Sequence, residues 1–245
     1  MREVDREIRE GFLGIINSRV SAIKAGESSG DDLLGTLLES NFKEIEQSGN
    51  KKNAGMSLED VISECKLFYF AGQETNGILL TWTCVLLSRH PEWQECAREE
   101  IFQVFGNGKV DFDRIQGLKI VPMILYEVLR LYPPVIELTK VAYEEQKLGD
   151  LIIPAGVQLM MPSILLHRDQ EIWGADSKEF NPGRFADGVS KAVKSPFFYI
   201  PFSWGPRICV GQNFALLQAK MALTMILQCF SLDLSPTYAH SPFTA

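Results

Sequence analysis

Apolar residues recur at three- and four-residue steps along much of the chain, and this pattern predicts a mostly helical protein. Residues 2–25 follow it, with charged residues between the apolar positions. Asp31 is placed to cap a second helix through residues 33–38. The polar stretch 41–55 that follows predicts a surface linker.

A long helix is expected next. Residues 57–60 have the spacing of a capping box, and the apolar-rich segment after them contains no proline until Pro91. At 1.5 Å per residue, the segment predicts a helix of about 50 Å. Pro91 suits the first turn of the next helix, and Pro122 similarly opens a helix that ends at the prolines 133–134.

The pattern then changes. Residues 136–161 form short runs rich in Val, Ile, Leu and Tyr, divided by glycine and proline, and they predict a small antiparallel sheet. A helix is expected at 163–167, followed by a long irregular segment at 174–206, a length at which loops are usually functional. A helix over 212–230 completes an α+β fold that is mainly α with a small antiparallel β-sheet.

Composition excludes some classes of protein. The 245 residues are 46% hydrophobic and 22% charged, which is typical of a globular chain. A net charge of −7 without a basic stripe argues against nucleic-acid binding. Five cysteines lack the paired spacing of a zinc site or a disulfide framework and indicate a reducing compartment. Residues 1–14 are charged and resemble neither a secretory signal nor a membrane span.

Cys209 lies in a loop suited to a thiolate metal ligand. Gly205 and Gly211 bracket it, at positions where a turn tightens and a flat ligand can come close. Arg207 places a positive charge near the sulfur, and the N-terminal amides of the following helix also stabilise a negative sulfur. Without these neighbours, a cysteine is more often a small buried hydrophobe.

The pattern Phe-x-x-Gly-x-Arg-x-Cys-x-Gly, from Phe202 to Gly211, resembles the haem-binding loop of the cytochrome P-450 family. The resemblance implies that Cys209 is the axial thiolate ligand of haem b and that Arg207 pairs with a haem propionate. It also implies that Phe202 packs near the sulfur and that Gly211 lets the next helix approach the ring, with Gly205 in the same loop. A thiolate ligand favours O–O cleavage and hence oxygen activation.

Residues 71–75, Ala-Gly-Gln-Glu-Thr, lie in the middle of the long predicted helix, where glycine and threonine are poor helix formers. By themselves they are more typical of a glycine at a helix crossing beside surface polar groups than of a catalytic site. They resemble the family's oxygen-activating motif. The resemblance implies that Glu74 and Thr75 deliver protons during oxygen activation, while Ala71 and Gly72 line the oxygen pocket.

Glu127 and Arg130 are spaced to pair on one helix face, which in isolation is typical of an exposed ion pair worth about 0.2–0.5 kcal/mol. Followed by Leu-Tyr-Pro-Pro, they resemble the family's second signature, which implies a buried pair bonded to Arg184. The family's usual Pro-Glu-Arg-Phe is here Pro-Gly-Arg-Phe, residues 182–185. The missing carboxylate predicts weaker support for Arg184, not its loss.

Two further residues have competing interpretations. Lys140 stands where the family commonly has an arginine that reaches a haem propionate, but it is equally typical of a solvated strand lysine. His167 could be a metal ligand or a general base, although no partner ligand stands near it in the sequence. The family has a similar His-Arg-Asp stretch with a structural role.

The chain most resembles plant family seventy-two of the cytochromes P-450, whose members oxidise terpenoids and related hydrophobic metabolites. This implies a haem-dependent monooxygenase that inserts one oxygen atom from O2 into a lipophilic small molecule. It also implies an NADPH-dependent flavoprotein reductase as partner. Full-length relatives are expected at the cytosolic face of the endoplasmic reticulum membrane, whereas this chain, without an anchor, is expected in the cytosol.

The resemblance covers the C-terminal half of the family's fold, and we expect one partial domain over residues 1–245. Its expected parts are a helical lead-in and linker (1–55), the long oxygen-site helix and the Glu-x-x-Arg helix (56–135), the sheet (136–161), and the irregular segment, haem loop and following helix (162–245). The family's N-terminal half and terminal hairpin are expected to be absent. The alternative is an inactive truncated fragment that does not hold haem stably, at most an interaction module. Peroxide rearrangement without O2 is disfavoured because it does not require the acid and alcohol of residues 71–75.

Overall fold

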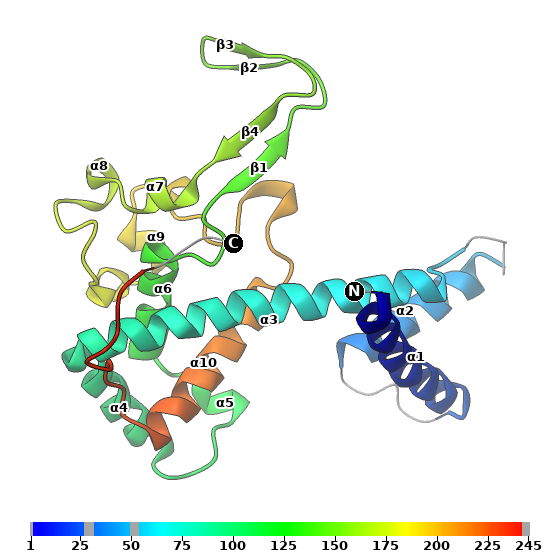
Figure 1. Cartoon of the computed structure of the whole chain (residues 1–245), viewed down its shortest axis with the longest axis horizontal. Coiled ribbons are helices and arrows are strands. Elements are labelled where there is room, and N and C mark those ends of the chain that lie inside the picture. Colours follow the sequence, from blue (N-terminus) through cyan, green and yellow to red (C-terminus); the bar gives the residue numbers. More distant parts are fainter. Residues whose placement is uncertain (1, 27–31, 50–53, 242–245) are drawn as a thin grey trace. The chain divides into compact units, whose positions relative to one another are not determined.

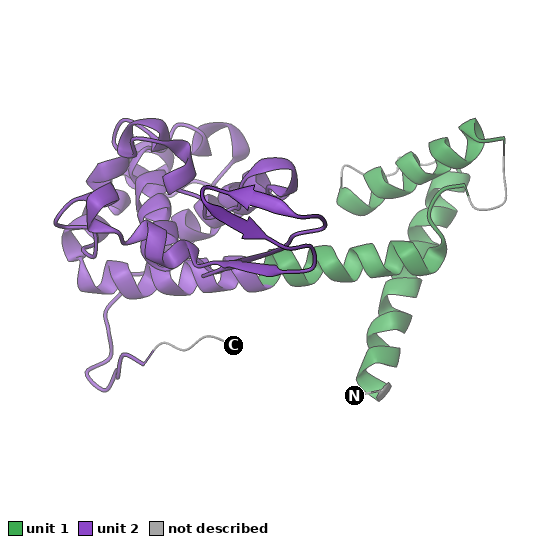
Figure 2. Ribbon diagram, turned by 90° about the horizontal axis from the view of Figure 1, so that it is seen from above, with its two compact units in different colours: residues 1–73 green, residues 74–245 purple. Residues whose placement is uncertain are grey.

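The computed structural model describes residues 2–26, 32–49 and 54–241. The chain divides into two compact units, residues 1–73 and residues 74–245 (Figure 2). Helix α3, Leu58–Arg89, contributes its first part to one unit and its second part to the other. No helix in the described ranges combines the length and the apolar character needed to cross a membrane.

The N-terminal unit packs three helices around a small apolar core. It contains α1 (Arg2–Lys24), α2 (Leu33–Gln47) and the first part of α3. The apolar stripe predicted over residues 2–25 does form a helix, and its Ile16 is fully buried. The other buried members of this core are Leu38, Val61 and Ile62.

Helix α2 is longer than the sequence pattern predicted. It runs to Gln47, so the prediction of a linker from residue 41 is wrong for residues 41–47. The reason is Asn41, which is buried and exchanges hydrogen bonds of 2.6 and 3.1 Å with the backbone of Met56, so that a polar residue serves packing here. Residues 50–53 of the predicted linker lie outside the described residues.

Caps define where two of these helices begin. Asp32 caps α2, because its Oδ1 accepts a hydrogen bond of 2.7 Å from the backbone N–H of Gly35. Asp31, the predicted cap, lies outside the described residues. At α3 the predicted capping box forms: Ser57 Oγ accepts from the Asp60 N–H at 3.2 Å, and Asp60 Oδ2 accepts from the Ser57 N–H at 2.9 Å.

The C-terminal unit holds the remaining elements in the order seen in Figure 1. Its further helices are α4 (Pro91–Phe105), α5 (Phe112–Ile115), α6 (Ile120–Leu131), α7 (Ser163–His167), α8 (Gln170–Trp173), α9 (Val189–Ala192) and α10 (Gln212–Cys229). Among the described residues of this unit, 3-10 turns are η1 (Pro182–Phe185), η2 (Pro196–Phe198) and η3 (Gly205–Arg207). The predicted irregular segment 174–206 is therefore interrupted by short helical turns, while α5 and α8 were not predicted.

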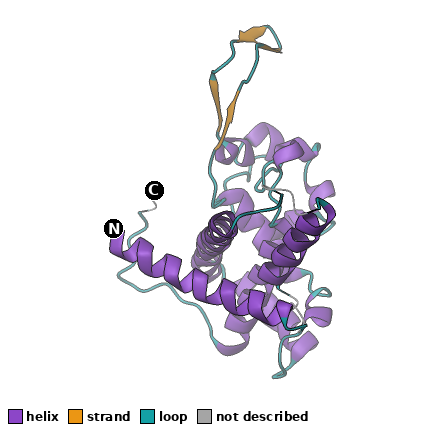
Figure 3. Cartoon of the chain, turned by 90° about the vertical axis from the view of Figure 1, so that its right-hand side faces the viewer, coloured by secondary structure: helices purple, strands orange, loops and turns teal. Residues whose placement is uncertain are grey.

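The predicted antiparallel sheet is present as two separate ladders (Figure 3). Strand β1 (Leu138–Val141) pairs with β4 (Gln158–Met161), and β2 (Gln146–Leu148) pairs with β3 (Leu151–Ile153). Gly149 has a φ of +59° between β2 and β3, a left-handed conformation that glycine adopts at little cost.

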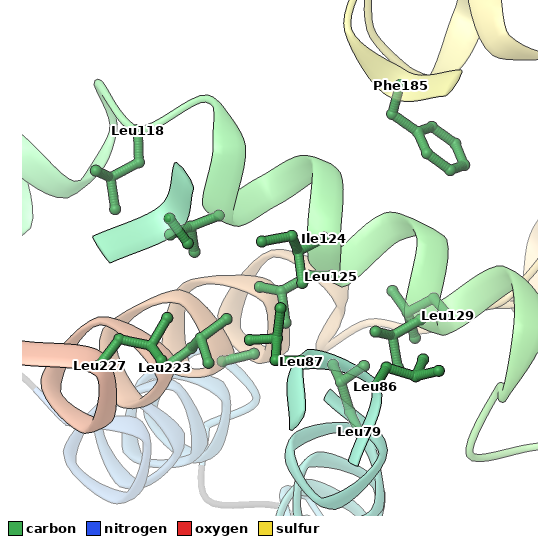
Figure 4. Close-up of a cluster of buried hydrophobic side chains, with 14 of the residues drawn as sticks. Leu79, Leu86, Leu87, Leu118, Ile124, Leu125, Leu129, Phe185, Leu223 and Leu227 are labelled. Atoms are coloured by element: carbon green, nitrogen blue, oxygen red, sulfur yellow. The ribbon is translucent and has the colours of Figure 1, made fainter. Parts of the chain in front are cut away.

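The core of the C-terminal unit joins the second part of α3 to α6 and α10. Figure 4 shows leucine and isoleucine side chains from these three helices in one cluster. Each side chain contributes about 1.5–3 kcal/mol relative to exposure. The labelled members from these helices are Leu79, Leu86, Leu87, Ile124, Leu125, Leu129, Leu223 and Leu227.

Helix α6 begins at Ile120, two residues before the predicted start at Pro122. The carboxylate of Glu100, on α4, accepts hydrogen bonds of 2.6–3.1 Å from the backbone N–H groups of residues 119–121. It satisfies donors that have no partner within the helix and places negative charge at the positive end of the helix dipole. A remote carboxylate, not the proline, therefore sets the first turn.

Candidate functional site

The loop before α10 is held in shape by its backbone. Ser203 and Gly205 have φ values of +67° and +84°. The N–H of Cys209 donates to the carbonyl oxygen of Phe202 at 2.9 Å, and the N–H of Ser203 donates to that of Ile200 at 3.0 Å. These bonds close the loop and fix the position of Cys209.

Cys209 is exposed, and so are the apolar side chains on both sides of it. Ile208 is 47% exposed, Val210 87% and Phe214 68%. A cysteine surrounded by exposed large apolar groups is unusual on a solvated surface and fits a flat, largely apolar group bound by the sulfur. The residues present at this site therefore fit a haem.

The glycines beside the thiol are compatible with a ligand at this surface. A Cβ built at Gly205 would meet no atom within 4 Å, although its positive φ would strain a side chain. A Cβ at Gly211 would lie 3.9 Å from Cys209 Sγ, which is ordinary contact. Packing within the chain therefore does not require glycine at Gly211, and the site keeps open space.

Helix α10 begins immediately after the loop and points its N-terminal end toward it. Gly211 is the residue that precedes the helix, and its carbonyl oxygen accepts the N–H of Ala215 at 2.8 Å. The N–H of Gln212, in the first turn, donates to the carbonyl oxygen of Cys209 at 3.4 Å, and the amides of this turn carry partial positive charge. Arg207, exposed on η3, adds a full positive charge two residues before the cysteine. Phe202 is half-buried and packs against the core of the unit.

The acid and alcohol of the predicted oxygen site lie on α3. Glu74 is exposed and Thr75 is half-buried. The next residue, Asn76, is 4% exposed, and its Nδ2 donates a hydrogen bond of 2.7 Å to Gln218 Oε1 on α10. This bond brings the segment that carries Glu74 and Thr75 to the helix that follows the cysteine loop.

Ala71 and Gly72 lie on the same helix, in the part that belongs to the N-terminal unit. Ala71 is exposed and Gly72 is half-buried. A Cβ built at Gly72 would meet no atom within 4 Å, so the contacts of the described chain do not require a glycine there.

Glu127 and Arg130 form a fully buried ion pair, unlike the exposed pair that their spacing alone would indicate. Arg130 donates two hydrogen bonds of 2.7 Å, one to each carboxylate oxygen of Glu127. Its remaining donors reach the carbonyl oxygens of His167, Ser177 and Glu179 at 2.5–3.1 Å. A bidentate pair with every donor occupied is the geometry in which a buried charge is tolerated.

Arg184 contacts this pair. Its Nε lies 3.4 Å from Glu127 Oε1, and its Nη1 donates to the carbonyl oxygen of Trp173 at 3.1 Å. Asp176 provides two further acceptors for Nη2, its carbonyl oxygen and its Oδ2, both at 2.6 Å. The arginine therefore has a neighbouring carboxylate even though residue 183 is glycine. No periodic signal in the sequence pointed to Asp176.

His167 serves the structure. Its ring is fully buried, and its Nε2 accepts a hydrogen bond of 2.9 Å from the N–H of Ile200, at the entry to the cysteine loop. Burial, with a smaller effect of the nearby Arg130 charge, lowers the pKa of His167 from 6.5 to about 4. The ring is therefore neutral near pH 7.

Lys140 lies on β1 opposite Leu159 and is half-buried.

Comparison with known proteins shows the family to which the chain belongs. The cytochrome P450 family matches residues 1–244, and the chain belongs to that family. Secologanin synthase 1 of Catharanthus roseus is 62% identical over 244 residues, which are 100% of this chain and 47% of that protein. The 7-deoxyloganic acid hydroxylase of the same plant is 61% identical over 246 residues, 100% of this chain and 47% of the relative.

A third relative, cytochrome P450 CYP72A219 of Panax ginseng, is 60% identical over 243 residues, 99% of this chain and 47% of its own length. Its name places it in plant family seventy-two, as the sequence motifs suggested for this chain. The chain spans about half the length of the curated relatives it matches.

Proposed function

We propose that this chain supplies the haem-binding and oxygen-activating part of a monooxygenase. The reaction inserts one oxygen atom from O2 into a lipophilic, terpenoid-like small molecule, and an NADPH-dependent flavoprotein reductase supplies the electrons. The observation that carries the proposal is the exposed Cys209, set among exposed apolar side chains at the start of α10. Relatives named as a synthase and a hydroxylase support the same reaction class.

Haem b is the proposed cofactor. Cys209 provides the axial thiolate, Arg207 and Lys140 are the proposed partners of the propionates, and Phe202, Gly205 and Gly211 belong to the binding surface. When bound, haem supplies the redox chemistry of O2. The protein contributes the ligand, its electrostatic stabilisation and an apolar binding surface.

Proton delivery is the proposed task of Glu74 and Thr75. The exposed Glu74 carboxylate can take a proton from water, and the half-buried Thr75 hydroxyl can pass one inward. Ala71 and Gly72 are the proposed lining of the oxygen pocket. The overall reaction, RH + O2 + NADPH + H⁺ → ROH + H2O + NADP⁺, is balanced. For full-length relatives, the proposed setting is the cytosolic face of the endoplasmic reticulum membrane.

Isotope labelling tests the proposal. The chain, supplied with haem and a plant reductase, is incubated with labelled O2 and a panel of terpenoids. We expect labelled oxygen in the product and none from labelled water. Thr75→Ala is expected to lower the rate of product formation about 10²-fold. Thr81→Ala is the matched control on the same helix, because Thr81 is exposed and bonded to the Gly77 carbonyl oxygen.

Two results would argue against this function. If the label came from water, the reaction would not be a monooxygenation. If the chain took up no haem, the alternative of an inactive fragment, at most an interaction module, would be favoured.

A further inference from the structure

Asn76 is a buried polar side chain that the assigned chemistry does not use. It is 4% exposed, in a helix where asparagine is a poor helix former. Its Nδ2 donates to Gln218 Oε1 at 2.7 Å, across 142 residues of sequence. A buried amide without such a bond would cost about 1–3 kcal/mol, so Asn76 favours the one arrangement of α3 and α10 in which its partner is within reach.

The Asn76–Gln218 hydrogen bond restricts the packing of α3 against α10 more sharply than the apolar contacts beside it. One turn further along α3, Leu79 is buried in the same core as Leu223 of α10. Apolar contacts are less directional than hydrogen bonds, so they restrict the rotation and register of the two helices less sharply. The hydrogen bond of 2.7 Å is directional and further restricts the rotation and register of α3 against α10 at Asn76.

The rotation of α3 about its axis at Asn76 determines the positions of the neighbouring residues. In an α-helix successive side chains are about 100° apart in rotation and about 1.5 Å apart along the axis. Thr75 and Glu74 directly precede Asn76 on the helix, so holding the helix at Asn76 holds the backbone positions from which the hydroxyl and the carboxylate extend. Gly72 and Gly77 flank them and weaken the helix locally, which makes an external constraint more important.

The other end of the bond belongs to the helix of the cysteine loop. Gln218 lies in the second turn of α10, whose first turn starts at Gln212 beside Gly211. The carbonyl oxygen of Cys209 accepts the N–H of Gln212 at 3.4 Å, so the cysteine is joined to the first turn of the helix that carries Gln218. Within the C-terminal unit, the hydrogen bond between the Asn76 and Gln218 side chains thus connects the segment of Glu74 and Thr75 to the helix that follows Cys209.

We propose that Asn76 and Gln218 are a positioning pair that holds Glu74 and Thr75 at the correct place for proton delivery. The proposal rests on the proposed monooxygenase function. Displacing a relay by about 1 Å can lower a rate by up to about 10²-fold. NADPH is then consumed without oxidation of the substrate, because O2 is reduced to hydrogen peroxide: O2 + NADPH + H⁺ → H2O2 + NADP⁺.

The experiment compares four variants in the haem-loaded chain with reductase and substrate: Asn76→Ala, Gln218→Leu, the double variant and Gln218→Glu. Glutamate keeps an acceptor oxygen for Asn76, and its charge is tolerable because Gln218 is exposed. We expect the first three to lower product formed per NADPH about tenfold, with a matching rise in hydrogen peroxide and little change in KM. Gln218→Glu is expected to remain close to wild type.

Gln103→Ala is the control, because Gln103 is exposed on α4 and is expected to change nothing. A second readout does not depend on turnover. Each single variant is expected to raise the equilibrium constant of unfolding about fivefold, and the double variant to raise it no further, because both remove one bond.

The outcomes separate the two proposals. A wild-type chain without the absorption band of a thiolate-ligated carbonyl complex overturns the proposed function and this inference with it. If the wild type forms product with little hydrogen peroxide, and the variants form as much product per NADPH as the wild type, the positioning pair alone is overturned. Strictly additive effects in the double variant would also overturn it.

Discussion

Asp176 Oδ2 lies 2.6 Å from Arg184 Nη2 and supplies a carboxylate beside an arginine that is preceded by glycine at position 183. The hydrogen bond from Arg184 is the main cause that lowers the pKa of Asp176 below its ordinary value. Arg184 also contacts the buried Glu127. The acid at 176 therefore supports the link between the irregular segment and α6.

Replacing Asp176 by alanine tests this support. The carboxylate is 44% exposed, so we expect Asp176→Ala to lower the free energy of unfolding by only about 1 kcal/mol. Urea unfolding followed by circular dichroism measures the change. Asp187→Ala, at an exposed acid nearby, is expected to leave the midpoint unchanged. Equal midpoints for the two variants would contradict the role given to Asp176.

Removing charge from the buried pair should be more damaging. Glu127→Gln leaves Arg130 buried with its bidentate partner lost, and we expect a loss of about 3 kcal/mol in the free energy of unfolding. The same unfolding measurement on Glu99→Gln, an exposed glutamate of α4, is the control. A loss below 1 kcal/mol would mean that the pair is not buried in solution.

Acid should destabilise the protein through His167. Its pKa is about 4 in the folded chain against 6.5 when unfolded, so the unfolded state binds the proton more readily between these values. The stabilisation from the neutral ring is complete above about pH 6.5 and declines as the pH falls toward 4, by about 3 kcal/mol in all.

His167→Gln removes this titration. The difference in unfolding free energy between wild type and variant, measured at several pH values from 7 to 4, is expected to shrink as the pH falls. A difference that stays constant over this range would show that His167 does not contribute to the acid sensitivity.

The start of α6 depends on Glu100. Glu100→Gln removes the charge that accepts the N–H groups of residues 119–121, and we expect a loss of about 1 kcal/mol. Hydrogen exchange of the amides at residues 120 and 121 is expected to accelerate. Glu95→Gln, at an exposed glutamate of the same helix, should leave both measurements unchanged. Unaltered exchange in Glu100→Gln would contradict the capping role.

Local signals predicted the elements well where the cause lies within a few residues. The capping box at Ser57 and the absence of proline before Pro91 predicted α3, and apolar periodicity predicted α10. Contacts between distant residues caused the errors. Asn41 extends α2 because it bonds to Met56, and Glu100 moves the start of α6 away from Pro122.

For the candidate site, too, local motifs were visible in the sequence and contacts between distant residues were not. The loop motif singled out Cys209, and the spacing of Glu127 and Arg130 suggested their pairing, although not the burial that the family resemblance implied. Asn76 had a signal, since it is a poor helix former in mid-helix, but its partner Gln218 could not be found from sequence. The bond joins residues that only the tertiary packing brings together.

Cys209 as the haem thiolate ligand is the central claim, and the absorbance spectrum of the reduced, carbon monoxide-treated chain tests it most directly. The chain and its Cys209→Ser and Cys229→Ser variants are each supplied with haem; Cys229 is also exposed. We predict the red-shifted Soret band of a thiolate-ligated carbonyl complex in the wild type and in Cys229→Ser, and its absence in Cys209→Ser. Persistence of that band in Cys209→Ser, or its absence from the wild type, would contradict the account.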